Sequence, residues 1–295
     1  MQTDPSNCGA CNKTCAGTCS DGHCVVTIAG PTNNSEYWID ADANRVYLSN
    51  GISVSSIPNG GGTPTNLTSG YTASNLGEIT SDASYVYFVD GWLPVTIGRV
   101  PKTGGPVDVL ATLDDFRSNV ATDGVNVYVR GANYVYSVPV GGGSPVSIAA
   151  SDGSSLMEHG ICTDGTTVFW ASVNGLMATP VVGGPTKAIV PGQIDEVLCS
   201  GSWVYYLANS YPSRTPTSGS GKVEIVSLTY GYLAVGNEIY VAQGPQIWSI
   251  DLNSLAATEL VDDADLDPVT PAIVASSSFV TWVDYFGGAV EQVAP

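Results

Sequence analysis

Seven pairs of residues, one in each of seven similar segments, are the best candidates for a binding or catalytic site. When the segments are aligned, each pair lies at the start of the same predicted strand, but its chemical character changes from segment to segment. Aromatic rings beside carboxylates and an amide suit a sugar or a cationic group. The candidate ligand-binding residues are Tyr37, Trp38, Glu78, Asn119, His159, Glu196 and Tyr230.

The same set contains the best candidates for acid–base chemistry. Glu78 and Glu196 are the residue types that a glycosidase or a lyase uses as a pair. His159 is one of two histidines in the chain, and it could transfer protons or ligate a metal. A hydrogen-bonded structural histidine is the alternative. The sequence has no Ser-His-Asp set, phosphate-binding glycine loop or HExxH motif, so we assign no catalytic residue.

Two further features could bind something. Asp263, Asp265 and Asp267 alternate in an acidic run, and carboxylate oxygens at that spacing can hold calcium. The glycine and the terminal glutamate of an EF-hand loop are missing, so a solvated loop is the alternative. We expect no other cofactor. Trp92 lies on a predicted turn, where it is either an exposed contact residue or is packed beneath its loop.

A repeat along the chain supplies the strands that must position these residues. Its most recognisable part is a small polar turn followed by Val or Ile, usually an aromatic residue, and another large apolar residue. Successive copies are 35 to 41 residues apart, and each segment contains four strand-like pieces. That period is typical of a propeller blade. The seven copies are 42–48, 82–88, 123–129, 164–170, 200–206, 235–241 and 276–282.

The two ends of the repeat region predict how the ring closes. The last repeat ends on a predicted third strand within 288–295. Residues 24–30 form a predicted strand that is not preceded by the first three strands of a blade. Pairing these two strands completes the seventh blade and removes open sheet edges. We therefore predict an all-β, seven-bladed β-propeller over residues 25–295, closed by an N-terminal strand, after a small cysteine-rich segment at residues 1–24.

Seven cysteines indicate an oxidising compartment, because five of them crowd into one short polar segment. A segment with so few apolar residues requires disulfides or a metal to fold, so disulfides are the first interpretation and zinc ligation the second. An odd number leaves one thiol for another partner. Cys162 and Cys199, in neighbouring blades, are either bridged or two buried thiols. The segment's cysteines are Cys8, Cys11, Cys15, Cys19 and Cys24.

Charge and hydropathy exclude several classes of partner. The formal net charge is −18, with 27 acidic and 9 basic side chains, so nucleic acid and anionic membrane surfaces are poor partners. No apolar run approaches the roughly 18 residues that a membrane-spanning helix needs. Met1 directly precedes polar residues, so if the protein is secreted we expect this to be a mature form without a signal peptide.

The repeats resemble known families. Val86-Tyr-Phe-Val-Asp90, Val168-Phe-Trp-Ala-Ser172 and Val280-Thr-Trp-Val-Asp284 resemble blades of the Tyr-Trp-Thr-Asp type, and the rhythm of 99–106 is similar to the TolB-like repeats of bacterial extracytoplasmic proteins. Asp4-Pro-Ser-Asn-Cys-Gly-Ala-Cys11 resembles the cysteine-rich segments of secreted or surface proteins from myxobacteria and their relatives. The resemblance implies an extracellular binding module and supplies no catalytic residues.

Three functional hypotheses follow. The first is an extracellular, periplasmic or cell-surface binding module whose glycan, peptide or protein ligand lies at one mouth of the channel. The second is an extracellular polysaccharide lyase or hydrolase, which requires Glu78, Glu196 and His159 to converge. The third is a structural subunit of a surface assembly that self-associates, for example through an unpaired cysteine.

Overall fold

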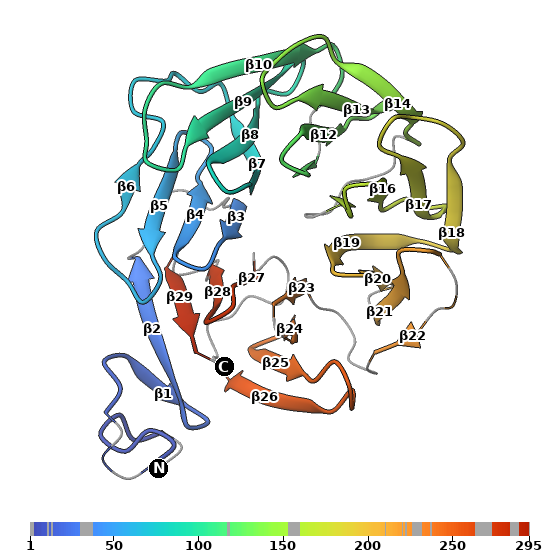
Figure 1. Ribbon diagram of the computed structural model, residues 1–295. Coiled ribbons are helices and arrows are strands. Elements are labelled where there is room, and N and C mark those ends of the chain that lie inside the picture. The colour runs from blue at the N-terminus through green and yellow to red at the C-terminus, as the bar shows by residue number, and fades with distance from the viewer. Residues whose placement is uncertain are drawn as a thin grey trace.

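The computed structural model describes residues 3–10, 12, 14–29, 38–116, 119–152, 160–209, 211–219, 221, 223–225, 232–236, 238–262, 273–283 and 289–294. These residues form seven antiparallel sheets arranged in a ring, and no helix occurs among them (Figure 1). The chain is therefore an all-β, seven-bladed β-propeller. None of the residues described here belongs to a helix that is long and apolar enough to cross a membrane.

The strands fall into four positions within a blade, counted outward from the centre of the ring (Figure 1). The first strands are β3 (Trp38–Ala41), β7 (Leu76–Ser81), β11 (Val120–Thr122), β15 (Ile161–Thr163), β19 (Ile194–Ser200), β23 (Tyr232–Val235) and β27 (Ile273–Ala275). The second strands are β4 (Arg45–Ser49), β8 (Tyr85–Asp90), β12 (Asn126–Arg130), β16 (Thr167–Trp170), β20 (Trp203–Ala208), β24 (Ile239–Gln243) and β28 (Val280–Val283).

The third and fourth strands form the outer half of each blade. The third strands are β5 (Val54–Pro58), β9 (Val95–Pro101), β13 (Tyr134–Pro139), β17 (Gly175–Pro180), β21 (Tyr211–Pro216), β25 (Gln246–Ile250) and β29 (Val290–Val293). The fourth strands are β6 (Thr65–Asn66), β10 (Asp108–Leu113), β14 (Val146–Ala150), β18 (Lys187–Pro191), β22 (Val223–Glu224), β26 (Ala257–Asp262) and, in the seventh blade, β2 (His23–Ala29).

Ring closure occurs where the sequence predicts it. β2 pairs antiparallel with β29, with Val25 opposite Val293, so the N-terminal strand completes the seventh blade. A further strand, β1 (Thr18–Ser20), pairs with β2 as a fifth strand, which the repeat did not predict. The Ser20 hydroxyl accepts a hydrogen bond from the backbone N–H of Asp262 at 3.0 Å, which ties β1 to the sixth blade. The domain boundary at residue 24 stays a prediction.

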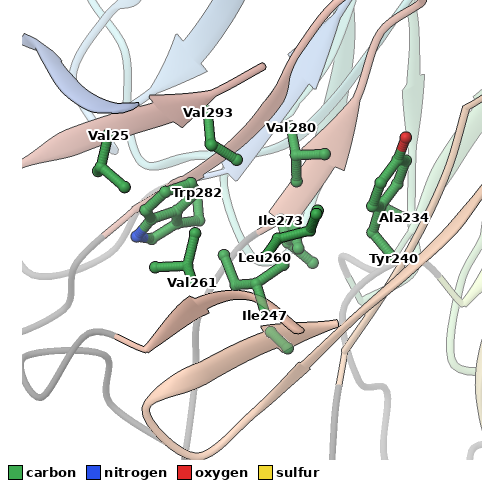
Figure 2. Close-up of a cluster of buried hydrophobic side chains, with 11 residues drawn as sticks. Val25, Ala234, Tyr240, Ile247, Leu260, Val261, Ile273, Val280, Trp282 and Val293 are labelled. Carbon is green, nitrogen blue, oxygen red and sulfur yellow. The ribbon is translucent and has the colours of Figure 1, made fainter. Parts of the chain in front are cut away.

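The described part of the hydrophobic core is divided into seven clusters, and each cluster fills the space between two adjacent blades. Figure 2 shows the cluster between the sixth and seventh blades, where Trp282 of β28 packs among Val25, Val261 and Val293. The next cluster along the ring joins Ile28 of β2 to Ile39 of the first blade. Because both clusters contain a β2 residue, the ring is closed by apolar packing as well as by strand pairing.

The polar turn of the repeat has a clear structural role. In three blades an aspartate Oδ1 accepts hydrogen bonds from backbone N–H groups within the turn. The Oδ2 of the same aspartate accepts a hydrogen bond from the hydroxyl of a tyrosine five residues later. The tyrosine–aspartate distances are 2.7 Å for Asp42–Tyr47, 2.6 Å for Asp82–Tyr87 and 2.7 Å for Asp123–Tyr128. An aspartate and an aromatic residue therefore recur together because each pair fixes one hairpin.

These tyrosines predict how stability depends on pH above neutrality. Burial, followed by the bond to aspartate, raises the pKa of Tyr47, Tyr87 and Tyr128, and burial raises the pKa of Tyr206 and Tyr240 to about 12. A raised folded-state pKa gives stability that is complete below the unfolded value of about 10 and is lost as pH rises through the folded value. We expect the free energy of unfolding, measured in urea, to fall between about pH 10 and 12.

Tyr128→Phe is the matched variant, because it removes one of these hydroxyls and keeps the ring. Its alkaline loss of stability should be shallower than that of the wild type, while its stability at neutral pH falls by about 1 kcal/mol with the lost hydrogen bond. A stability that stays constant up to pH 12, with as much phenolate absorbance in the folded protein as in the urea-unfolded protein at pH 11, would show that these hydroxyls are not held neutral by the fold.

Candidate functional site

The two ends of the ring are structurally distinct. The strands of each blade alternate in direction, so the first–second and third–fourth connections share one end, called here the turn face. The second–third connections share the other end with the segments that lead from a fourth strand into the next blade. This end is called here the loop face. The aligned positions of the predicted ligand-binding residues, called here the binding column, come at or just before the first strands in sequence, so the column approaches these strands from the loop face.

The first strands of all seven blades line a central cavity of about 260 Å³. Its lining includes the carboxylates of Asp40 and Glu78, the hydroxyl-bearing Thr80, and the disulfide between Cys162 and Cys199. Small-molecule sites in proteins usually have volumes of about 300–1,000 Å³. The channel is therefore at or below the small end of that range.

The structure brings two of the predicted column residues together. Glu78 and Asn119 are both buried, and the Asn119 amide donates a hydrogen bond to the Glu78 carboxylate at 2.7 Å. Glu196 is also buried, but it is not among the residues that line the cavity. Trp38 is half-buried and packs against the apolar cluster between the first two blades. These positions favour interior packing and hydrogen bonding, and their binding roles stay predictions.

A β-bulge explains where the two glutamates lie. The pairing of β7 with β8 shifts register between Leu76 and Ile79, and β19 shifts against β20 between Ile194 and Glu196. A bulge places an extra residue in one strand and redirects its side chain. Glu78 and Glu196 therefore occupy corresponding irregular positions in the second and fifth blades. A repeat alignment alone does not reveal these bulges.

Several predicted residues lie outside the described part of the chain. They include three members of the binding column, the three aspartates of the possible calcium loop and one cysteine. The predictions for these residues are therefore not tested by the structure and stay predictions. They are Tyr37, His159, Tyr230, Asp263, Asp265, Asp267 and Cys11.

The described cysteines form three disulfides. Cys8 is bonded to Cys19 and Cys15 to Cys24 within the N-terminal segment, and Cys162 is bonded to Cys199 between the fourth and fifth blades. Four of the five clustered cysteines are thus disulfide-bonded and not zinc ligands. The Cys162–Cys199 bond joins two neighbouring first strands directly at the channel wall.

Beside the binding column lies a buried ion pair that the sequence did not single out as a site. Arg130 is only 1% exposed, and its guanidinium donates a hydrogen bond to the Asp152 carboxylate at 3.3 Å. Asp152 also accepts a hydrogen bond from the Ser172 hydroxyl. Burial lowers the pKa of Arg130 to about 10, although Asp152 opposes this shift. Gly160 lies beside both Asn119 and Arg130. A Cβ atom at this position would be 2.4 Å from the Asn119 side-chain oxygen, so a larger residue would collide with the buried Asn119 side chain.

Exposed apolar side chains are concentrated on the loop face. Eleven large apolar residues are exposed in the part of the chain described, and seven of them lie in second–third connections, at the start of third strands or in the segment after β10. We call these seven residues the apolar crescent, because they follow one another through the first five blades. They are Ile52, Trp92, Leu93, Phe116, Tyr134, Val173 and Tyr211.

The other four exposed apolar residues are distributed differently. Val125 and Val182 lie in connections of the turn face, whereas Val109 and Val146 lie on fourth strands at the periphery. Single exposed apolar residues are normal on protein surfaces, so the observation of interest is that seven of the eleven share the loop face. Of the crescent, the sequence had identified only Trp92 as a possible contact residue, and it is 59% exposed.

Comparison with known proteins identifies the fold. No protein-family model and no curated protein matches this chain. It is similar to a chain in the crystal structure of the mitotic checkpoint complex, with a TM-score of 0.69 and 12% identity over 92% of this chain and 93% of that chain.

A second similar structure is PorZ, an essential bacterial surface component of the type-IX secretion system of Porphyromonas gingivalis. Its TM-score is 0.63 and its identity 11%, over 90% of this chain but only 37% of the PorZ chain. At these identities the similarity is one of fold.

Proposed function

We propose that this protein is an extracellular or cell-surface interaction module that binds a protein partner on its loop face. The observation that carries the proposal is the apolar crescent: seven exposed large apolar side chains on one face of the ring. Protein interfaces have apolar, aromatic-rich centres, and Trp and Tyr are over-represented among the residues that dominate binding energy. The crescent includes Trp92, Tyr134 and Tyr211.

The described interior of the ring supports a surface site over a channel site. Glu78 and Asn119 are buried and bonded to each other, and the cavity beside them is small for an oligosaccharide. The hydrolase or lyase hypothesis needs Glu78 and Glu196 to face one substrate, yet only Glu78 lines the cavity. A partner that covers the loop face requires no change in these groups.

The extracellular location is part of the same proposal. Three disulfides form among the described cysteines, and disulfides persist mainly in oxidising compartments. The resemblance of the cysteine-rich segment to those of secreted and surface proteins of myxobacteria and their relatives supports the same location.

The test compares two double variants that change exposed apolar residues on opposite faces. Phe116→Ser/Val173→Ser alters the loop face, and Val125→Ser/Val182→Ser alters the turn face. Wild type and both variants are immobilised and used to capture proteins from the culture supernatant and the cell surface of the source organism. We expect at least one protein to bind wild type and the turn-face variant, and to bind the loop-face variant about tenfold more weakly.

Equal capture of every partner by both variants would contradict a loop-face site. A glycan array run on the same three proteins separates the other ligand class. Selective glycan binding that is lost in the loop-face variant, with no protein captured, would replace the protein partner by a sugar. Circular dichroism and urea denaturation should show that both variants are as stable as the wild type, because exposed substitutions rarely change stability by more than about 0.5 kcal/mol.

A further inference from the structure

The loop face carries exposed negative charge without exposed positive charge among the residues described. Asp114 is exposed there, the Asp152 side chain is 21% exposed, and Asp195, at the start of β19, is half-buried. Arg130 is the one described cation that reaches this face, and it is buried against Asp152. Among the residues described, this face is therefore apolar, and its exposed charge is negative.

The other described cations have different positions. Arg45 begins β4 and Lys102 follows β9, both at the turn face, where Lys102 binds Asp42 at 2.7 Å. Lys187 begins β18 after a turn-face connection. Arg99 pairs with Asp108, and Arg214 stacks on Trp203, which is the first residue of β20. The described cations other than Arg130 thus lie at the turn face or on outer strands, although the turn face also carries acidic side chains such as Asp42, Asp82 and Asp123.

Acidic and apolar groups alternate within one stretch of the crescent. Asp114 is two residues from Phe116 in the segment between the second and third blades. The Asp115 carboxylate in that segment accepts a hydrogen bond from the Asn133 side-chain amide at 2.8 Å. This bond holds the segment against the hairpin that carries the exposed Tyr134.

The next blade continues this pattern. Asp152 accepts hydrogen bonds from the side chains of Ser172 and Asn174, on either side of the exposed Val173. Its ion pair with Arg130 ties this hairpin to the third blade. The segments that carry Phe116, Tyr134 and Val173 are therefore held by hydrogen bonds to Asp115 and Asp152. A surface that is preorganised in this way loses little conformational entropy on binding.

We propose that the partner presents a cationic apolar segment, in which Lys or Arg side chains alternate with aromatic or aliphatic ones, to the surface formed by Asp114, Phe116, Tyr134, Asp152 and Val173. This inference rests on the proposed function and names the chemistry of its partner. Complementary charge steers association and excludes anionic competitors, while the apolar side chains supply the buried contact. Anionic segments of equal hydrophobicity are repelled.

The test is a selection of short random peptides displayed on phage against the intact protein. Peptides enriched in Lys and Arg together with aromatic or aliphatic residues are expected. Synthetic copies are then measured by fluorescence anisotropy against wild type, Phe116→Ser/Val173→Ser, Asp114→Asn and Asp108→Asn. Asp108 lies on a peripheral strand and serves as the matched charge control.

Affinity for the cationic peptides should fall about tenfold in Phe116→Ser/Val173→Ser and about threefold in Asp114→Asn at low salt, and stay unchanged in Asp108→Asn. Raising the salt concentration should remove the effect of Asp114→Asn, because exposed charges are screened.

Two results overturn parts of the argument separately. Peptides that need Phe116 and Val173 but show no excess of Lys and Arg would refute the cationic partner and leave the loop-face site standing. No enrichment, or enriched peptides that bind Phe116→Ser/Val173→Ser as tightly as wild type, would refute the loop-face site and with it this inference.

Discussion

Trp282→Ala should lower the free energy of unfolding by about 4 kcal/mol. Trp282 is fully buried, and it packs in the cluster between the sixth and seventh blades with Val25 of β2 and Val261 of β26 (Figure 2). Loss of a buried tryptophan removes its apolar transfer energy and leaves a cavity, because the surrounding side chains relax only in part. The cavity would lie at the junction that the N-terminal strand closes, so the seventh blade should also become the least protected part of the ring in hydrogen exchange.

Trp92→Ala is the matched control, because it makes the same substitution at a side chain that is 59% exposed. Its stability in urea should stay within about 0.5 kcal/mol of the wild type. If the two tryptophan variants lose the same small amount of stability, the cluster around Trp282 does not hold the ring closed. Trp282→Phe should recover a large part of the loss by refilling the site.

Most of the fold could be predicted from the sequence because its repeat has a local physical cause. The hydrogen bond from the Tyr87 hydroxyl to Asp82 fixes a hairpin within six residues, so the pattern recurs wherever that hairpin forms. The blade count and the pairing of β2 with β29 follow from counting the repeats and the strands left over at each end. β1 could not be predicted in this way, because it belongs to no repeat and depends on contacts such as Ser20 with Asp262.

The candidate site was less predictable, because it depends on burial and on small changes in register. The repeat alignment placed Glu78 and Glu196 in one column, but both lie at bulges and are buried. Gly77 beside Glu78 is a residue type that often marks a bulge, but Asp195 beside Glu196 gives no such signal. The separation of the two glutamates is set by the closed ring, which is a property of all seven blades together.

The apolar crescent was missed for a related reason. Residues such as Phe116, Tyr134 and Val173 have the types that usually fill a core, so residue type alone assigns them to the interior. A usable signal was present in their positions. Each lies beside a second–third connection or in a segment between blades, so marking large apolar residues at those positions would have found them before the structure was known.

Removal of the Cys162–Cys199 disulfide should destabilise the protein by about 4 kcal/mol. The two cysteines are 37 residues apart in sequence, and a cross-link of that length strongly restricts the unfolded chain. The bond also joins β15 to β19 at the channel wall, where the first strands of adjacent blades otherwise meet without a ladder between them. The measurement is urea denaturation of Cys162→Ala/Cys199→Ala beside the wild type, both without reductant.

The single variants make this prediction specific to the bond. Either Cys162→Ala or Cys199→Ala breaks the disulfide, so each should lose about as much stability as the double variant, and the two losses should not add. If the losses add, the effect comes from packing of the two side chains and not from the cross-link. The dependence of the unfolding free energy on urea should also steepen in the double variant, because an unlinked chain exposes more surface when it unfolds.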